Sequence, residues 1–311
     1  MLADTLALLV WPMRGAFAAA IAVGAASKAV PAIADSLLAS GKTYRRPRTQ
    51  TGETTSTAHS TSLWKQALAA LEAASVPKAW FEHFYLLGAA WNALLGACLL
   101  AMQATGAAAV PAHLWLVWTM IETQLVRRVV ECRMWPSAGS RMNVMYYLVG
   151  VFFYIGMPPT LLIEGAAAAA AHRPAAAHPA AVAVAVAQFV VGSVVQNRVH
   201  AQLASMRRKL GSGTAAAAAE TRDAAQPPKL KYPLPTGPLF ALVACPHYTS
   251  EIVIYLSFFG LSGFSDLSAA IVAVFVATGL FLTADQQYNW YMRMYPKDAP
   301  PGWKRIIPFV F

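Results

Sequence analysis

The sequence is poor in charge and in cysteine. Only 12% of its 311 residues are charged and 57% are hydrophobic, whereas a soluble domain carries roughly 25% charge. A water-soluble core does not accommodate that much apolar sequence, so a soluble globular protein is excluded. Cys98, Cys132 and Cys245 lie far apart and form no CxxC pair, which argues against a disulfide framework and a zinc site.

The motifs of soluble nucleotide-binding domains are also missing. No GxGxxG follows a strand and no Walker loop occurs, and Gly211-Ser212-Gly213 is interpreted as part of a linker. A nucleotide cofactor would therefore need a site built by membrane helices and basic loops. No repeat of about 20 to 50 residues is visible, which argues against the inverted-repeat transporters.

The sequence contains instead a series of long apolar stretches. A helix needs about 20 predominantly apolar residues to cross a bilayer. Stretches near this length predict transmembrane helices at residues 5–26, 81–103, 111–130, 144–164, 178–197, 237–259 and 264–284. We expect an all-α polytopic membrane protein, a bundle of about seven transmembrane helices. Residues 1–311 would form one membrane domain, with a C-terminal catalytic region from about residue 190 to 311.

The basic residues predict how this bundle is oriented. Cytoplasmic loops of membrane proteins collect Lys and Arg. With a lumenal N-terminus, 22 of the 24 basic residues fall on the cytosolic side and only Arg14 and Arg173 do not. The C-terminus is then cytosolic, and topology accounts for most of the formal charge of +10 without nucleic-acid binding. Anionic lipid or an anionic ligand at the cytosolic face remains an alternative.

Two other features qualify this topology. The first stretch contains Pro12 and Arg14 and is alternatively a cleaved signal, but no small-residue cleavage site stands out, so a helix is expected. Residues 49–62, rich in Thr and Ser, and residues 211–228, with an Ala run and a Pro pair, are predicted to be flexible connectors.

Polar residues inside the predicted spans are costly in hydrocarbon and are candidates for function. One cluster opens the second span and combines Glu82 and His83 with aromatic residues that alternatively form an interfacial belt. Another lies at the end of the third span and comprises Glu122, Gln124, Arg127, Arg128 and Glu131. Gln124, an arginine and Glu131 recur on one helix face. They form either a structural ion pair or a site for a cofactor phosphate.

Two further clusters lie in the C-terminal half. One comprises Gln196, Asn197, His200, Gln202, Arg207, Arg208 and Lys209. A solvated helix face explains its basic residues, whereas Gln196, His200 and Arg207 on one side suit an adenine ribose and its phosphate. The other is the segment Cys245 to Glu251 (CPHYTSE) inside the sixth span. Its histidine is either structural or functional, and Pro246 breaks the helix and frees backbone groups that a ligand can use.

In this order, the clusters resemble the steroid 5α-reductase family, most closely its polyprenol reductase branch. The resemblance covers nearly the whole chain and rests on residues 41–43, 76–92, 124–131, 196–207, 232–240 (YPLPTGPLF), 245–251, 290–291, 295–297 (YPK) and 307–311 (IPFVF). Two positions depart from the family pattern. Tyr288 stands where the family often has His, and residues 298–303 are additional, so the tail loop is expected to bulge.

The resemblance implies a seven-helix fold that takes NADPH from the cytosol and a lipid from the bilayer. It implies reduction of the alpha-isoprene double bond of polyprenol or polyprenal, in dolichol synthesis for protein N-glycosylation at the endoplasmic reticulum membrane. The aldehyde is chemically the easier substrate, because a conjugated carbonyl accepts the charge that hydride addition delivers.

The implied site residues fall into two groups. The group that polarises the substrate oxygen is expected among His83, Tyr85 and Gln124. The residues implied to bind NADPH are Arg127, Arg128, Gln196, His200, Arg207, Tyr232, His247, Glu251 and Tyr291. No metal site, nucleic acid or obligate protein partner is expected.

Three alternatives remain at this point. A steroid reductase or a long-chain enoyl-CoA reductase would share the fold and differ in its product. A membrane methyltransferase that acts on prenylated proteins would bind S-adenosylmethionine instead of NADPH. A transporter or channel would show flux without cofactor, and the missing repeats already argue against it.

Overall fold

The computed structural model describes residues 2–27, 74–136, 139–172, 178–220 and 232–311, except for the side chains of residues 210–220. Its helices are α1 (Leu2–Ala26), α4 (Phe81–Ala104), α5 (Ala112–Met134), α6 (Val144–Ala170), α7 (Pro179–Glu220), α8 (Pro238–Leu242), α9 (Pro246–Leu261) and α10 (Leu267–Met294). A 3-10 turn, η2 (Lys78–Trp80), precedes α4. The all-α class is confirmed. The family-like residues 41–43, the connector at 49–62 and Arg173 lie outside the described residues.

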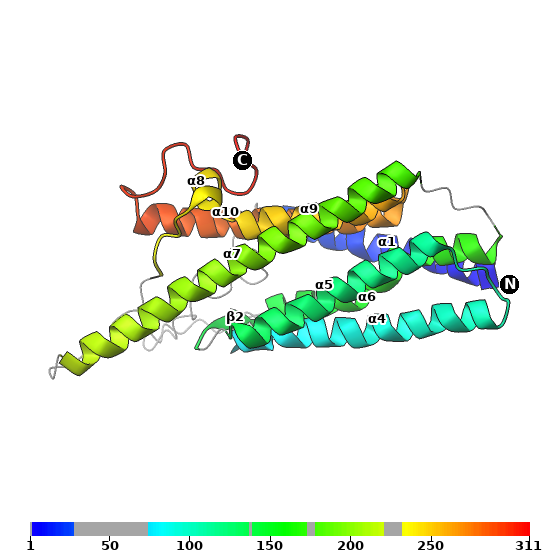
Figure 1. Ribbon diagram of the computed structural model, residues 1–311, viewed down its shortest axis with the longest axis horizontal. Helices are drawn as coiled ribbons and strands as arrows, with labels where there is room; N and C mark the ends of the chain where they lie inside the picture. Colours follow the sequence, from blue (N-terminus) through cyan, green and yellow to red (C-terminus); the bar gives the residue numbers. More distant parts are fainter. Residues whose placement is uncertain (1, 28–73, 137–138, 173–177, 221–231) are drawn as a thin grey trace, which may run out of the picture.

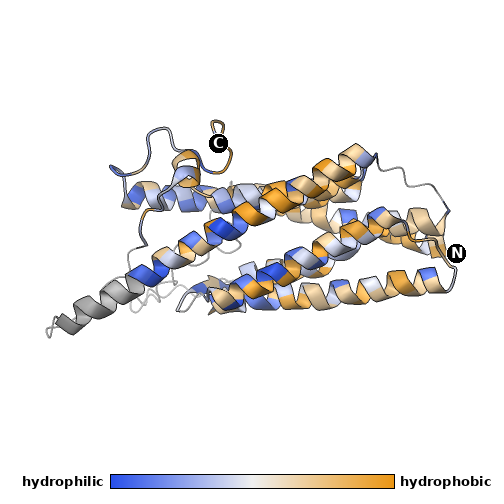
Figure 2. Cartoon of the chain, viewed as in Figure 1, coloured by the Kyte–Doolittle hydropathy of each residue, from blue (hydrophilic) through white to orange (hydrophobic). Residues whose placement is uncertain are grey.

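The long helices lie side by side along one axis (Figure 1). α7 packs along α9, α1 packs against α6 and α10, and α4 packs against α5 and α6. One end of the bundle carries β2 and the C-terminal tail (Figure 1), and hydrophilic residues of α5, α7 and α10 gather toward it (Figure 2). We call this end the tail end.

The helices agree in length and composition with a polytopic membrane protein. Within the part of the chain that the structure describes, five segments are long and apolar enough to cross a bilayer: Leu2–Ala26, Lys78–Ala104, Val144–Ala170, Pro179–Lys209 and Leu267–Met294. The third predicted span forms α5, which contains several charged residues, and the sixth is interrupted. α8 ends at Leu242 and α9, 16 residues long, begins at Pro246. The sixth predicted span, 237–259, therefore consists of two helices, with a break before Pro246.

The interruption between α8 and α9 is the place where the tail docks. Pro246 occupies the first turn of α9, where its missing N–H is tolerated. The backbone N–H of Ala244 donates to the carbonyl of Lys304 at 2.8 Å, and that of Cys245 donates to the carbonyl of Arg305 at 3.1 Å. The helix break at Pro246 is confirmed, but the backbone groups freed here bind the chain's own tail.

A short antiparallel ladder joins the starts of α4 and α6 at the tail end. β1 (Ser75–Pro77) pairs with β2 (Arg141–Asn143), and the N–H of Lys78 donates to the carbonyl of Ser140 at 2.8 Å. The Asn143 side chain caps α6 by accepting from the N–H of Met145 at 2.7 Å. This ladder fixes the backbone position of Lys78, at the start of η2.

α7 extends well beyond its predicted span of 178–197. It continues as helix to Glu220, so the part of the predicted connector from 211 to 220 is helical. Alanine has the highest helix propensity of any residue type, so the Ala run favours a helix here, which accounts for the error. The remainder of that connector, 221–228, lies outside the described residues.

Polar residues away from the tail end are paired across helices. Arg14 of α1 binds Glu164 of α6, and its Nε donates to the Ser268 hydroxyl at 3.1 Å. Between α4 and α5, the Asn92 amide donates to Glu122 at 2.9 Å. These contacts satisfy groups that would be costly in hydrocarbon. Asn92 and Glu122, predicted as candidates for function, contact one another at this helix interface.

Candidate active site

A cavity of about 400 Å³ opens within the tail half of the bundle. Its polar wall comes from η2, α5, α7, α9 and residues 232–233, and includes Lys78, Arg128, Glu131, His200, Arg207, Tyr232, His247, Tyr248 and Glu251. Its apolar wall comes from α4, α6 and α10, and includes Phe84, Val149, Gly150, Phe153, Phe275, Val276, Gly279 and Leu280. Tyr85 and Tyr154 also line the cavity. The same cavity therefore presents both charged groups and an apolar surface.

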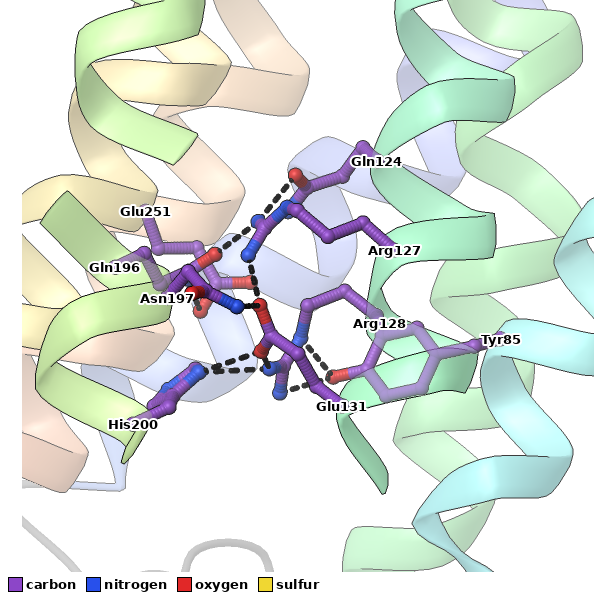
Figure 3. A network of polar contacts seen from close by, with 9 residues as sticks. All are labelled: Tyr85, Gln124, Arg127, Arg128, Glu131, Gln196, Asn197, His200 and Glu251. Atoms are coloured by element: carbon purple, nitrogen blue, oxygen red, sulfur yellow. Dashed lines mark hydrogen bonds and ion pairs between the residues drawn. The ribbon is translucent and has the colours of Figure 1, made fainter. Parts of the chain in front are cut away.

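The carboxylate of Glu131 is the centre of a polar network that joins α5 to α7 (Figure 3). Glu131 is 3% exposed and binds the guanidinium groups of both Arg127 and Arg128. It also accepts from the Asn197 amide at 2.9 Å and contacts His200 Nδ1 at 2.8 Å. Nδ1 of His200 lies 2.8 Å from Arg128 as well, and it either donates to Glu131 or accepts from Arg128.

Arg127 extends the network from α5 to α9. Its guanidinium donates to the side-chain oxygens of Gln124 and Gln196, the former at 2.7 Å. The Gln196 amide then donates to Glu251 at 3.2 Å. Arg127 and Gln124 stand behind the cavity wall, whereas Glu251 lines it. The network thus holds three helices in register (Figure 3).

Arg128 connects the network to Tyr85 on α4. Its Nε and one terminal nitrogen donate to the phenol oxygen of Tyr85, at 3.3 and 3.1 Å. Tyr85 is 4% exposed and its ring packs edge-on against Tyr154, with centroids 5.0 Å apart. Arg128 donates to the phenol oxygen, so the phenol proton is not used in this contact, and a side-chain hydrogen bond links Tyr85 to Tyr154. A cation on this oxygen also makes the phenol a stronger donor.

The C-terminal part of the chain supplies the rest of the polar wall. The His247 ring lies 4.1 Å from Tyr248 and 5.7 Å from His200 between centroids. Gln287 of α10 donates to the Tyr248 hydroxyl at 2.6 Å. Tyr291 lines the cavity and is 5% exposed. These side chains bring α9 and α10 together around the cavity mouth.

The segment 232–240 is positioned by α7 and by the tail. Gly237 has φ +118°, a backbone conformation that L side chains rarely adopt. An added Cβ at Gly237 would lie 3.2 Å from Gln202, whose amide donates to the carbonyl of Thr236. Tyr232 packs edge-on against Trp290 at 6.0 Å. Glycine thus lets this segment turn closely over α7 and place Tyr232 at the cavity.

The predicted site residues fall into three groups by position. Those that line the cavity are Tyr85, Arg128, His200, Arg207, Tyr232, His247, Glu251 and Tyr291. Those that belong to the network but not to the lining are Gln124, Arg127 and Gln196. His83 belongs to neither, because its exposed ring lies 5.3 Å from Trp80 and its Nδ1 3.3 Å from the Tyr147 hydroxyl.

The separation of His83 from Tyr85 has a simple helical cause. Residues two apart on an α-helix point to nearly opposite sides. Tyr85 faces the cavity, so His83 faces away from it. The expectation that His83 and Tyr85 both serve the substrate oxygen therefore does not agree with their positions, and only Tyr85 is placed to do so.

Several cavity residues were not predicted as site residues, among them Lys78, Tyr154 and Cys132. Lys78 was assigned to a basic loop and to a family-like segment, Tyr154 was taken as part of an apolar span, and Cys132 was set aside as a lone cysteine. Tyr154 could have been found from the sequence, because a phenol is a polar group and polar groups inside a span are candidates for function. Lys78 has no such signal, because its place depends on the pairing of β1 with β2.

Both departures from the family pattern are accommodated in the C-terminal core. Trp303, from the additional residues, is 5% exposed, packs against Tyr288 and Tyr291, and donates from its indole to the carbonyl of Phe240 at 2.6 Å. Tyr288 lies under the guanidinium of Arg305, 4.5 Å from the ring centroid. The extra segment thus contributes an aromatic anchor as well as the expected loop.

Comparison with known proteins adds an independent line of information. A family model described as 3-oxo-5-alpha-steroid 4-dehydrogenase matches residues 142–311. Polyprenal reductase 2 of Oryza sativa subsp. japonica is 28% identical over 232 residues, covering 64% of this chain and 61% of the relative. Polyprenal reductase of Saccharomyces cerevisiae is 28% identical over 276 residues, covering 87% and 84%. The match therefore spans about three fifths of the rice relative and most of the yeast one.

Proposed function

This chain belongs to the 3-oxo-5-alpha-steroid 4-dehydrogenase family, and we propose that it reduces the double bond next to the aldehyde of a polyprenal, with NADPH as reductant. Members of this family are oxidoreductases that act on CH–CH groups. The relatives in rice, yeast and Arabidopsis thaliana are named polyprenal reductases, which favours this substrate. The observation that carries the proposal is that one cavity has both a polar wall and an apolar wall, and that Tyr85 lines this cavity.

Tyr85 polarises the substrate oxygen in this mechanism. When bound, NADPH supplies a hydride to the β-carbon of the conjugated aldehyde. The phenol of Tyr85 donates a hydrogen bond to the aldehyde oxygen, on which negative charge develops as the double bond accepts the electron pair. Arg128 holds the phenol oxygen and stabilises the charge that reaches it. Protonation of the α-carbon completes the saturated aldehyde, the precursor of dolichol for N-glycosylation.

The residues of the polar wall fit a pyridine dinucleotide. Lys78 and Arg207 line the cavity, and among the described residues neither forms an ion pair with a carboxylate. They are therefore available for the phosphates. His200, Tyr232, His247 and Tyr291 offer rings and polar tips for the sugars and bases, and Glu251 offers an acceptor.

Arg127 and Arg128 do not fit the role of phosphate ligands. Both guanidinium groups are engaged by Glu131, and Arg127 also binds two glutamine side chains. We therefore propose that these arginines shape the site and that the phosphates bind Lys78 and Arg207 instead.

Replacing Lys78 or Arg207 by Ala is expected to weaken NADPH binding with little change in kcat. A hydrogen bond to a charged group contributes about 1.5–3 kcal/mol, so KM for NADPH should rise roughly 10- to 100-fold. Steady-state kinetics and NADPH titration by tryptophan fluorescence measure this. Arg208→Ala is the matched control, because Arg208 is exposed on the same helix and does not line the cavity. Equal loss in Arg208→Ala would contradict the assignment.

The proposed reaction is tested with the purified protein and three substrates. Polyprenal, polyprenol and a 3-oxo-4-ene steroid are incubated separately with NADPH, and products are followed by mass spectrometry. Addition of two hydrogens to polyprenal alone supports the proposal. Reduction of the steroid alone would keep the family chemistry and overturn the substrate, and methyl transfer from S-adenosylmethionine without NADPH oxidation would overturn the reaction.

The same proposal places the protein in the endoplasmic reticulum membrane. Its tail end, with Lys78, Arg207 and the C-terminus, faces the cytosol, where NADPH is available, and the N-terminus is lumenal. The bilayer then delivers the polyprenyl lipid to the apolar wall. The catalytic unit comprises the whole described bundle, because α4 and α5 contribute Tyr85 and Arg128 as directly as residues 190–311 contribute the C-terminal wall.

A further inference from the structure

We infer that the substrate's isoprenoid tail leaves the cavity beside Gly279 on α10, so that the missing side chain at this position determines which tails the enzyme accepts. The inference rests on the proposed function. It concerns the apolar wall between α6 and α10, which the polar chemistry of the site does not use.

The cavity is too small to enclose the whole substrate. Its volume of about 400 Å³ lies near the lower end of the range of roughly 300–1,000 Å³ for small-ligand sites. The reactive aldehyde lies at Tyr85 in the proposed mechanism, next to the site of the dinucleotide. A chain of many isoprene units must therefore extend out of the cavity.

The polar wall is an unfavourable exit for such a chain. This wall contains Lys78, Arg128 and Arg207, and moving methylene groups from an apolar environment to polar, hydrated surroundings is unfavourable. The apolar wall instead is partly open, because Val149 of α6 lines the cavity and is 37% exposed. A tail that leaves here enters the hydrocarbon of the bilayer directly.

Two phenylalanines and two glycines shape this wall. Phe153 of α6 and Phe275 of α10 stack with ring centroids 5.4 Å apart and join the two helices. Gly150 and Gly279 lie one helical turn away from them, and both turns run toward the tail end because α6 starts there and α10 ends there (Figure 1). The wall therefore changes from bulky to small at the level of Gly150 and Gly279.

Only one of these glycines borders open space. A Cβ added at Gly150 would lie 2.6 Å from the Phe84 ring, so that position is already filled. A Cβ added at Gly279 would meet no atom within 4 Å, although Gly279 lines the cavity. Glycine in a helix interior is less stable than alanine, and here the missing side chain leaves room for a ligand.

The Gly279→Leu variant tests this passage by filling it. We expect kcat/KM for a long-chain polyprenal to fall about 10-fold or more, a size typical of steric changes in an apolar pocket, whereas kcat/KM for geranial, a short analogue with the same reacting end, stays near wild type. NADPH binding, measured by fluorescence titration, should be unchanged because the polar wall is untouched. Gly279→Ala should keep the fold and lower the long-to-short ratio less.

Gly15→Leu is the matched control. Gly15 is an exposed helix glycine whose added Cβ also meets no atom within 4 Å, but it lies on α1 and outside the cavity lining. It should leave both activities unchanged. If the ratio of kcat/KM for long-chain polyprenal to that for geranial is unchanged in Gly279→Leu, or both values fall equally, the proposed passage is overturned. Turnover of polyprenal by the wild-type protein would still uphold the proposed function. Absence of that turnover in the wild-type protein would overturn both.

Discussion

Tyr85→Phe is expected to lower kcat for polyprenal reduction by about 100- to 1,000-fold, the usual effect of removing one donor to a developing oxyanion. The substitution removes the phenol oxygen, which accepts the hydrogen bonds from Arg128, and keeps the ring, whose centroid lies 4.9 Å from the Arg128 guanidinium. The ring that packs against Tyr154 is retained. The loss should therefore appear in kcat, with KM for NADPH and the unfolding temperature close to wild type.

A comparison of two α4 variants separates the candidates His83 and Tyr85. His83→Ala should retain wild-type kcat, because His83 is exposed and contacts Trp80 and Tyr147 outside the cavity. Single-turnover oxidation of NADPH in detergent, with each variant at saturating polyprenal, reports the chemical step. A large loss in His83→Ala together with an active Tyr85→Phe enzyme would reverse the assignment.

Glu131→Gln is expected to destabilise the whole tail half of the bundle. Removing one partner of a buried ion pair costs about 3–5 kcal/mol, because the remaining charge stays buried without compensation. Here the carboxylate compensates both Arg127 and Arg128 and also binds Asn197. The unfolding temperature should fall, and NADPH binding should weaken because the carboxylate contacts of Glu131 with Asn197 and His200 on α7 are weakened.

Glu82→Gln provides the control for this prediction. Its partner Arg133 is 62% exposed, so their ion pair is worth about 0–1 kcal/mol. Thermal unfolding of both variants in the same detergent gives the comparison. The double variant Glu131→Gln/Arg127→Gln should recover part of the stability, since it removes one of the two stranded charges. Equal stability of the Glu131→Gln and Glu82→Gln proteins would show that the network does not hold the helices together.

Helical periodicity predicted several parts of the site from the sequence. Gln124, either Arg127 or Arg128, and Glu131 were placed on one face of α5, and in the structure Arg127 contacts both Gln124 and Glu131. The break at Pro246 was also predicted, because proline cannot continue a helix. Both results depend on residues within about two turns of each other, where local geometry determines the neighbours.

Contacts between distant segments were beyond such reasoning. The contact of Glu131 with His200 joins residues 69 apart, and the backbone contact of Cys245 with Arg305 joins the helix break to the tail. Sequence spacing put His83 and Tyr85 in one cluster, but only the packing of α4 against α5 and α6 decides which side faces the cavity. Lys78 likewise reaches the cavity through strand pairing.

The sequence by itself determined that this protein is helical and embedded in a membrane, because apolar length and scarce charge leave no other way to satisfy its backbone. It also determined which polar residues lie within predicted apolar spans. Tertiary structure alone decided their surroundings: Glu131 pairs with two arginines, the Tyr85 oxygen accepts from Arg128 beside the cavity, and Gly279 borders open space. The reason is physical, since periodicity defines the face of a helix but only packing supplies the partner opposite it.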